Sequence, residues 1–140
     1  MTTRTGAGSF VVACGCGERS DVLKQGVAAL TGMHLMVDGV TERLLTTKDL
    51  FHFLATCPGV IGMTVIRGPE VFRTDIGICG ITVIAESHIA IHVNGSEVHV
   101  DVFSCRGFET EPVMKFIEQE LDLAQYRVQQ IERSSKLSYA

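Results

Sequence analysis

Short apolar runs rich in β-branched residues recur along the chain, and such runs are typical of strands. Two of them, residues 81–84 and 89–93, meet at Glu86-Ser87, and a third covers residues 98–103. Less regular apolar stretches predict three further strands, at residues 35–37, 60–66 and 127–131. The pair Gly68-Pro69 is expected to break the strand at residues 60–66, because glycine and proline interrupt regular structure.

Three segments predict helices. The first covers residues 21–30, with Ser20 as its N-cap. The second is capped by Thr47 and runs to Cys57, where Pro58-Gly59 ends it. The third covers residues 109–123, with Pro112 in its first turn and apolar residues three or four apart. Together, these elements predict an α+β fold, a two-layer sandwich in which an antiparallel sheet carries helices on one face.

A hairpin is predicted at Asn94-Gly95, because this dipeptide suits the positive φ angles of a two-residue type I′ turn. The turn would place Val93 opposite Ser96, and His92 opposite Glu97. Side chains alternate along a strand, so the titratable groups gather on one face and the aliphatic ones on the other. The titratable face carries His88, His92, Glu97, His99 and Asp101. Polar groups on one face of a sheet also fit an ordinary solvated side, and this reading stays open for His99, Glu97 and Asp101.

Length and charge narrow the class of partner. A chain of 140 residues fits one domain with a core of its own. The formal net charge is −4 and no cluster of Lys or Arg is present, so binding to nucleic acid or to an anionic membrane is not expected. No apolar run approaches the length of a membrane span, and no signal-peptide pattern opens the chain. We therefore expect a cytoplasmic protein that acts on a small molecule.

The five cysteines predict neither disulfides nor a metal site. They stand at positions 14, 16, 57, 79 and 105 and form no C-x-x-C pair. Cys14-Gly-Cys16 lacks a second ligand pair nearby, so a surface or packing role is the simpler reading. Reduced thiols and no bound metal are expected.

Five motifs carry a family resemblance. They are Gly32-Met33-His34-Leu35, Ile61-Gly62-Met63, Gly77-Ile78-Cys79-Gly80, the run from Ile84 to His92, and Asp101-Val102-Phe103-Ser104-Cys105. In content and order they resemble the prokaryotic S-adenosylmethionine decarboxylase proenzymes, over residues 32–133. The resemblance implies a decarboxylase-like domain at residues 32–140 behind an extension at residues 1–31. The small polar residues at 1–9 predict that the extension is partly disordered.

The resemblance also implies self-cleavage between Glu86 and Ser87, after which Ser87 is a covalently bound pyruvoyl group. The Ser87 hydroxyl would attack the Glu86 carbonyl, and since this step exchanges an amide for an ester, strained backbone is expected there. His92 is implied as the proton-transfer residue of cleavage and Cys105 as the general acid of decarboxylation. The pyruvoyl ketone would form a Schiff base with the substrate amine and act as its electron sink. Relatives are homodimers with facing sheets, and they serve polyamine synthesis.

The segment after His92 departs from the family pattern. Relatives usually continue with Thr-Trp-Pro-Glu or Thr-Phe-Pro-Glu, which supplies an aromatic plate for adenine and a carboxylate for ribose. Here Val93-Asn94-Gly95-Ser96 follows, about two residues shorter, and the chain has no tryptophan. Cys79 also stands where relatives carry serine, and a thiol is the poorer hydrogen-bond partner. The alternative from another functional class is therefore that the chain is not an enzyme but an unprocessed, non-catalytic regulatory homologue.

A second alternative concerns the substrate. Phe72 matches a family aromatic, although a core position would explain it equally well. In the predicted loop at residues 72–75, Arg73 would bind a carboxylate and Asp75 a terminal ammonium or guanidinium group. L-ornithine or L-arginine is then the rival of S-adenosylmethionine, while a solvated charge pair is the plain reading of Arg73 and Asp75.

Overall fold

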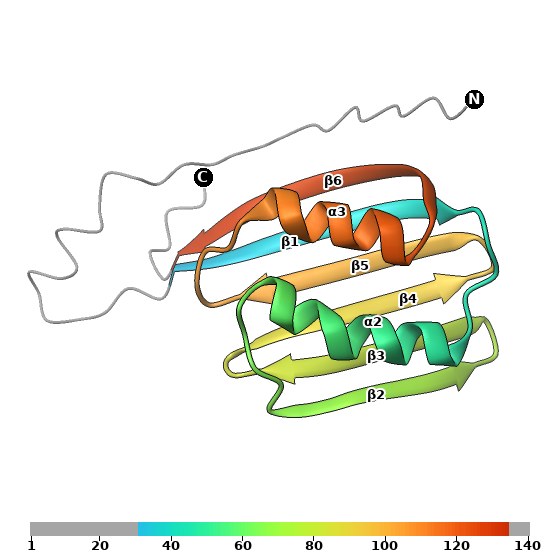
Figure 1. Ribbon diagram of the computed structural model, residues 1–140, viewed down its shortest axis with the longest axis horizontal. Coiled ribbons are helices and arrows are strands. Elements are labelled where there is room, and N and C mark those ends of the chain that lie inside the picture. Colours follow the sequence, from blue (N-terminus) through green and yellow to red (C-terminus); the bar gives the residue numbers. More distant parts are fainter. Residues whose placement is uncertain (1–30, 135–140) are drawn as a thin grey trace, which may run out of the picture.

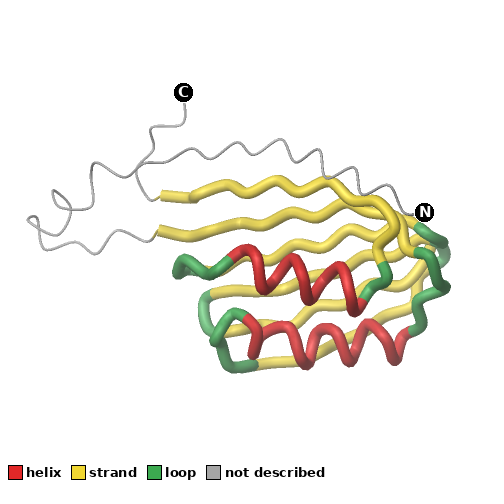
Figure 2. The backbone as a smooth tube through the Cα atoms, turned by 45° about the horizontal axis from the view of Figure 1, so that its top comes forward, coloured by secondary structure: helices red, strands yellow, loops and turns green. Residues whose placement is uncertain are grey.

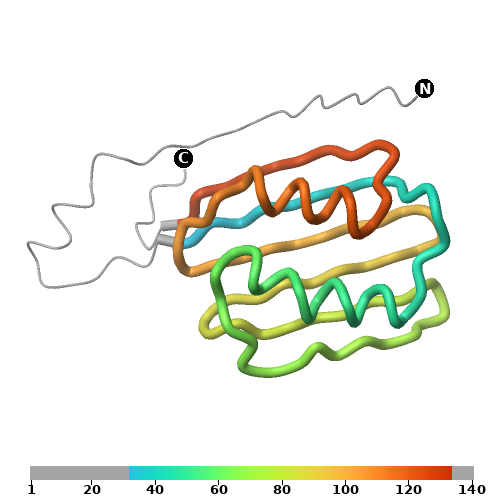
Figure 3. The backbone as a smooth tube through the Cα atoms, viewed as in Figure 1, coloured from blue at the N-terminus to red at the C-terminus, as the bar shows by residue number. Residues whose placement is uncertain are grey.

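The computed structural model describes residues 31–134, which form one six-stranded antiparallel sheet and two helices (Figure 1). The elements are β1 (Thr31–Thr41), α2 (Thr47–Val60), β2 (Arg67–Thr74), β3 (Gly77–Ile84), β4 (Ser87–Asn94), β5 (Glu97–Ser104), α3 (Thr110–Glu120) and β6 (Leu123–Ser134). The strand order is β2-β3-β4-β5-β1-β6, so the first and last of these strands lie side by side (Figure 3). The expected helix at residues 21–30 and the Cys14-Gly-Cys16 segment lie outside the described residues.

Both helices cover the same face of the sheet and leave the other face open, which confirms the predicted α+β two-layer sandwich (Figure 2). Along β4 and β5, aliphatic side chains alternate with polar ones, and the aliphatic set is buried. The core between the two layers includes Leu35, Phe53, Leu54, Ile89, Ile91, Val100 and Ile117. No helix within residues 31–134 is long and apolar enough to cross a membrane.

The hairpin between β4 and β5 has the predicted faces but a different register. The turn residues are Gly95 and Ser96, so Asn94 pairs with Glu97 and His92 pairs with His99. Gly95 has a φ of 59° and takes the first central position, which type II′ turns reserve for glycine. The predicted pairing of His92 with Glu97 is therefore wrong by two residues. A shift of two keeps every side chain on its face, because side chains alternate with period two.

Other boundaries also differ from the sequence expectation: the N-cap of α2 is Thr46 rather than Thr47, and β6 begins at Leu123, before the strand expected at residues 127–131. Residues 61–66 form no strand, and the edge strand β2 instead begins at Arg67 and contains Gly68-Pro69 beside a register shift. A proline is tolerated there because an edge strand leaves part of its donors unpaired. Helix α2 continues past Cys57 to Val60, with Pro58 buried inside it, since packing against the core offsets the missing backbone donor.

Candidate active site

The Glu86-Ser87 bond lies at a strained turn. Ile84 pairs with Ser87 across β3 and β4, so Ala85 and Glu86 form a two-residue hairpin loop. Ala85 has a φ of 54°, in the left-handed region that costs an L-residue other than glycine roughly 1 kcal/mol or more. The turn therefore holds the backbone in an unfavourable conformation one residue before Glu86.

Ser87 is held by the chain segment that follows β5. Its side chain is on the helix-covered face and only 2% exposed. The backbone N–H of Cys105 donates a hydrogen bond of 2.8 Å to Oγ of Ser87. The thiol of Cys105 donates to Oε2 of Glu86 across 3.7 Å. Three of the four predicted catalytic residues are thus together at one end of the sheet.

A cluster of rings borders this turn on the open face. The rings of His88 and Phe103 lie 5.6 Å apart, and the Arg133 guanidinium stacks 4.9 Å from the Phe103 ring centre. On the other side of Phe103, Nε2 of His34 lies 3.0 Å from Oδ1 of Asp101. Burial is the main cause that lowers the pKa of His88. The charges of His34 and Arg133 act in the same direction, and that of Asp101 acts against them. His88 is therefore neutral near pH 7.

His92, the fourth predicted catalytic residue, lies away from the turn. It is five residues further along β4, which corresponds to about 16 Å at the rise of an extended strand. It is also exposed on the open face, whereas Ser87 is buried on the other. Within one chain the structure does not bring His92 to Ser87.

Cross-strand pairing instead places His92 in a row that crosses the whole sheet on its open face. We call this set the histidine row. Reading from β2 to β6, it consists of Phe72, Cys79, His92, His99, Asp38 and Arg127. Phe72 is 49% exposed, so it is no core residue. Phe72 and Cys79 are thus near the proposed proton-transfer histidine, not near Ser87.

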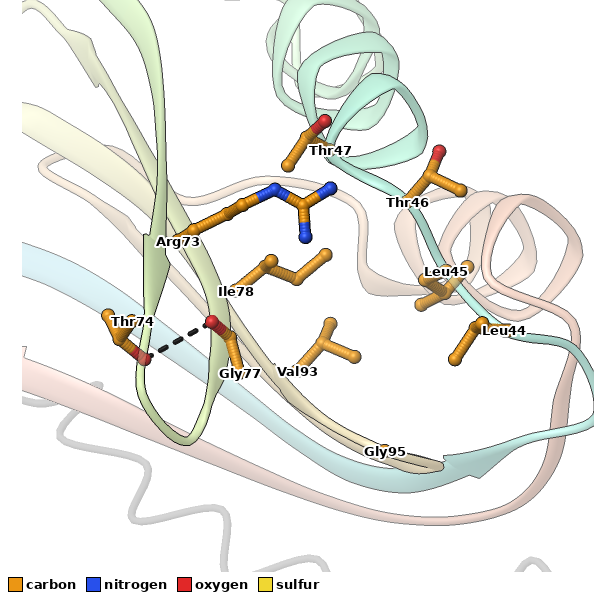
Figure 4. A pocket seen from close by; sticks show the side chains of 10 residues that line it. All are labelled: Leu44, Leu45, Thr46, Thr47, Arg73, Thr74, Gly77, Ile78, Val93 and Gly95. Atoms are coloured by element: carbon orange, nitrogen blue, oxygen red, sulfur yellow. Dashed lines mark hydrogen bonds between the residues drawn. The ribbon is translucent and has the colours of Figure 1, made fainter.

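Arg73 and Asp75 form no common site with Ser87 in one chain. Arg73 pairs with Ile78 near the opposite end of the sheet, and Asp75 lies in the β2–β3 turn rather than in a longer loop. Arg73 faces the helix side and extends over a pocket of about 330 Å³ between α2 and the β2–β3 hairpin (Figure 4). Leu45, Thr47 and Val93 line the same pocket. Phe72, the residue before Arg73, faces the open side of the sheet instead.

Several residues of this region carried no signal in the sequence. Ala85 is unremarkable until its φ angle is known. His34 and Arg133 come from β1 and β6, and only the strand order places them beside Phe103. Elsewhere, in α2, burial raises the pKa of the Cys57 thiol to about 12, so this thiol stays protonated near pH 7. Among residues 31–134, no three His, Cys, Asp or Glu side chains gather as a metal site.

Fold and site together define a two-layer α+β protein with a buried serine at a strained hairpin turn, next to a thiol. A family model described as S-adenosylmethionine decarboxylase matches residues 33–134. The chain therefore belongs to the S-adenosylmethionine decarboxylase family, which confirms the resemblance and supports a decarboxylase-like function. A search of curated proteins found no match.

Proposed function

We propose that this protein is a pyruvoyl-dependent decarboxylase that makes its cofactor by cleaving itself between Glu86 and Ser87. The observation that carries the proposal is the turn itself. A left-handed Ala85 precedes the bond to be cut, and the Ser87 hydroxyl is held by the backbone N–H of Cys105. These features supply the strain and the oriented nucleophile that an amide-to-ester exchange requires.

Self-cleavage would proceed in three steps. First, Oγ of Ser87 attacks the Glu86 carbonyl carbon, the amide C–N bond breaks, and the Ser87 nitrogen takes up the hydroxyl proton. A base then removes the α-proton of Ser87; the C–H electrons form a Cα=Cβ double bond, and the Glu86 carboxylate leaves with the electrons of the Cβ–O bond. Water finally converts the dehydroalanine to a pyruvoyl group and releases ammonia.

We assign the base to His92 of a second copy. The open face carries Val40, Phe72, Ile81 and Ile131 with 38% to 49% of each side chain exposed, and apolar groups of this kind suit contact between two sheets. A two-fold axis in the contact plane, perpendicular to the strands, would set the His92 end of one β4 over the Ser87 end of the other. A homodimer with facing sheets would thus bring His92 of one copy to the strand end that holds Ser87 of the other, on the open side of the sheet.

The residues at the turn fit a pyruvoyl group at position 87. The precursor serine is buried, and the only hydrogen bond described for its hydroxyl comes from a backbone N–H that remains after cleavage. Once formed, the group supplies an electron sink for decarboxylation. The Cys105 thiol would protonate the carbon that carbon dioxide leaves, and its contact with Glu86 at this turn supports that role.

S-adenosylmethionine is the proposed substrate, and L-ornithine or L-arginine the rival. The rival is kept because the segment that closes in the two-residue Gly95-Ser96 turn has neither the aromatic residue nor the carboxylate that relatives carry after the second motif histidine. The release of labelled carbon dioxide is measured with S-adenosylmethionine, L-ornithine and L-arginine in turn, which distinguishes the two substrate hypotheses. Release from S-adenosylmethionine alone would support the family substrate.

Denaturing electrophoresis tests self-cleavage. The purified protein is expected to separate into residues 1–86 and 87–140, with a carbonyl-trapping reagent adding its mass to the second piece only. Ser87→Ala is the control and should remain whole. A wild-type protein that stays whole and traps no reagent would exclude the enzymatic account and favour the non-catalytic homologue, in which Cys79 opposite His92 replaces a serine.

Complementation tests the second copy. Ser87→Ala retains His92 but has no nucleophile, while His92→Ala retains Ser87 but lacks the base. Each variant alone should stay whole. If His92 acts across a dimer, co-expression or refolding of a mixture should cleave only the His92→Ala chains.

A further inference from the structure

The half of the histidine row nearest β6 is a hydrogen-bonded triad. Nδ1 of His99 lies 2.7 Å from Oδ1 of Asp38, and the Arg127 guanidinium donates to Oδ2 of Asp38 across 3.1 Å. The three residues come from three adjacent strands, β5, β1 and β6. This arrangement exists only because β1 lies between β5 and β6.

The triad fixes which nitrogen of His99 is available. An ionised carboxylate only accepts hydrogen bonds, so Nδ1 of His99 carries the proton that it donates to Asp38. The hydrogen bond from His99 is the largest cause that lowers the pKa of Asp38, and Arg127 adds to it, so the carboxylate stays charged near pH 7. Nε2 of His99 is then the ring nitrogen left to exchange a proton.

The neighbour of His99 in the row is His92. The two residues are direct cross-strand partners on the same face, where Cβ atoms lie about 5 Å apart. Half of the His99 side chain is exposed, at 51%, and the triad borders a hollow of about 420 Å³ on the open face. His99 therefore has a second imidazole on one side and access to water on the other.

We propose that Asp38 and His99 form a proton relay that assists His92 during self-cleavage. His99 holds His92 in position and takes up the proton that His92 removes, while Asp38 orients His99. The inference deepens the proposed function and rests on it. The α-proton of Ser87 would pass to His92 and from there to Nε2 of His99, while the C–H electron pair forms the double bond and the Glu86 carboxylate leaves. His99 retains its Nδ1 proton throughout, and this proton stays hydrogen-bonded to Asp38. Asp38 and His99 are positioning residues, since they act through His92.

The charges around His99 come from each neighbouring strand. His92 faces it from β4 and Asp38 from β1, Arg127 lies one strand further on β6, and Glu97 and Asp101 are its same-face neighbours along β5. Asp38→Asn replaces the carboxylate with an amide, which can present either a donor or an acceptor to Nδ1 of His99, so the proton is no longer fixed on that nitrogen.

The test compares the rates of self-cleavage of wild type, His99→Gln and Asp38→Asn across pH on denaturing gels. Both variants are expected to cleave about tenfold more slowly at their best pH, a part of the 10² to 10⁴ that acid–base groups supply. The shape of the Asp38→Asn pH profile should also differ from that of wild type, because the charge beside the two imidazoles is removed. A purely structural role would lower the rate equally at every pH.

His52→Gln is the matched control, because Nε2 of His52 pairs with Glu120 at 3.7 Å on the helix layer, away from the row. It should cleave as wild type does. Circular dichroism of all variants checks the fold, and both triad substitutions are nearly isosteric at exposed or half-exposed sites, where the cost in stability is small.

Two negative results are distinguishable. If the wild-type protein never cleaves, the proposed function fails and the relay with it. If wild type cleaves and folded His99→Gln and Asp38→Asn match its rate and pH profile, the relay alone is overturned.

Discussion

The backbone N–H of Cys105 donates a 2.8 Å hydrogen bond to the hydroxyl of Ser87. Because the donor belongs to the main chain, substitution of the Cys105 side chain leaves it in place. The thiol points to Glu86 instead, at 3.7 Å. The structure thus separates two contacts of one residue: its backbone N–H holds the Ser87 hydroxyl, and its thiol faces the Glu86 carboxylate.

Cys105→Ala should therefore separate cleavage from turnover. We expect residues 1–86 and 87–140 to appear as separate pieces on a denaturing gel, because the backbone donor is kept. Release of carbon dioxide from S-adenosylmethionine should fall by about 10² or more, the usual loss for a general acid. Turnover at the wild-type rate would show that another group protonates the product.

Ala85→Gly should slow self-cleavage. Glycine adopts a positive φ without penalty, so the substitution removes about 1 kcal/mol of strain from the uncleaved turn, which corresponds to about fivefold in rate. A gel time course measures the effect. Ala55→Gly, at an exposed position of α2, is the control for a general loss of stability. Equal cleavage rates in Ala85→Gly and wild type would rule out strain as the driving force.

His88→Gln should weaken the acid sensitivity of the fold. The folded protein holds His88 with a lowered pKa, while the unfolded chain takes up this proton below a pH of about 6.5. The unfolded state then binds more protons, so stability falls as pH drops from 7 to 5. Urea midpoints should fall less steeply over this range in the variant. The same slope in variant and wild type would contradict a neutral, half-buried His88.

Gly80→Ala should destabilise the contact between α2 and the sheet. An added Cβ would lie 2.5 Å from Cδ1 of Leu54 and 3.0 Å from the carbonyl oxygen of Glu70, so the buried Leu54 side chain must move and the neighbouring strand must give way slightly, at about 1–3 kcal/mol. Gly59→Ala is the matched control. Gly59 lies inside α2, and a Cβ added there meets no atom within 4 Å, so the substitution should stabilise the helix by up to about 1 kcal/mol. Urea unfolding measures both. A stabilised Gly80→Ala would mean that the layers pack less closely than described.

The sequence predicted the elements whose side chains alternate regularly. Along β4 and β5 the alternation identified both faces correctly, because a period of two survives an error of two in register. It could not identify the register itself, since Gly95 fits either central position of a two-residue turn. Strand β2 was missed because it is an exposed edge interrupted by Gly68-Pro69, and such a strand shows little apolar pattern.

For the site, the sequence by itself determined which residues to look at: the family motifs singled out Glu86, Ser87 and Cys105, and these are close together in the structure. Only the tertiary structure decided the rest. The conformation of Ala85 depends on the hairpin, and the strand order, with β1 between β5 and β6, assembles Asp38, His99 and Arg127 beside His92. Motifs record neighbours along the chain, whereas contacts between distant strands depend on how a whole core packs, and no single segment encodes that.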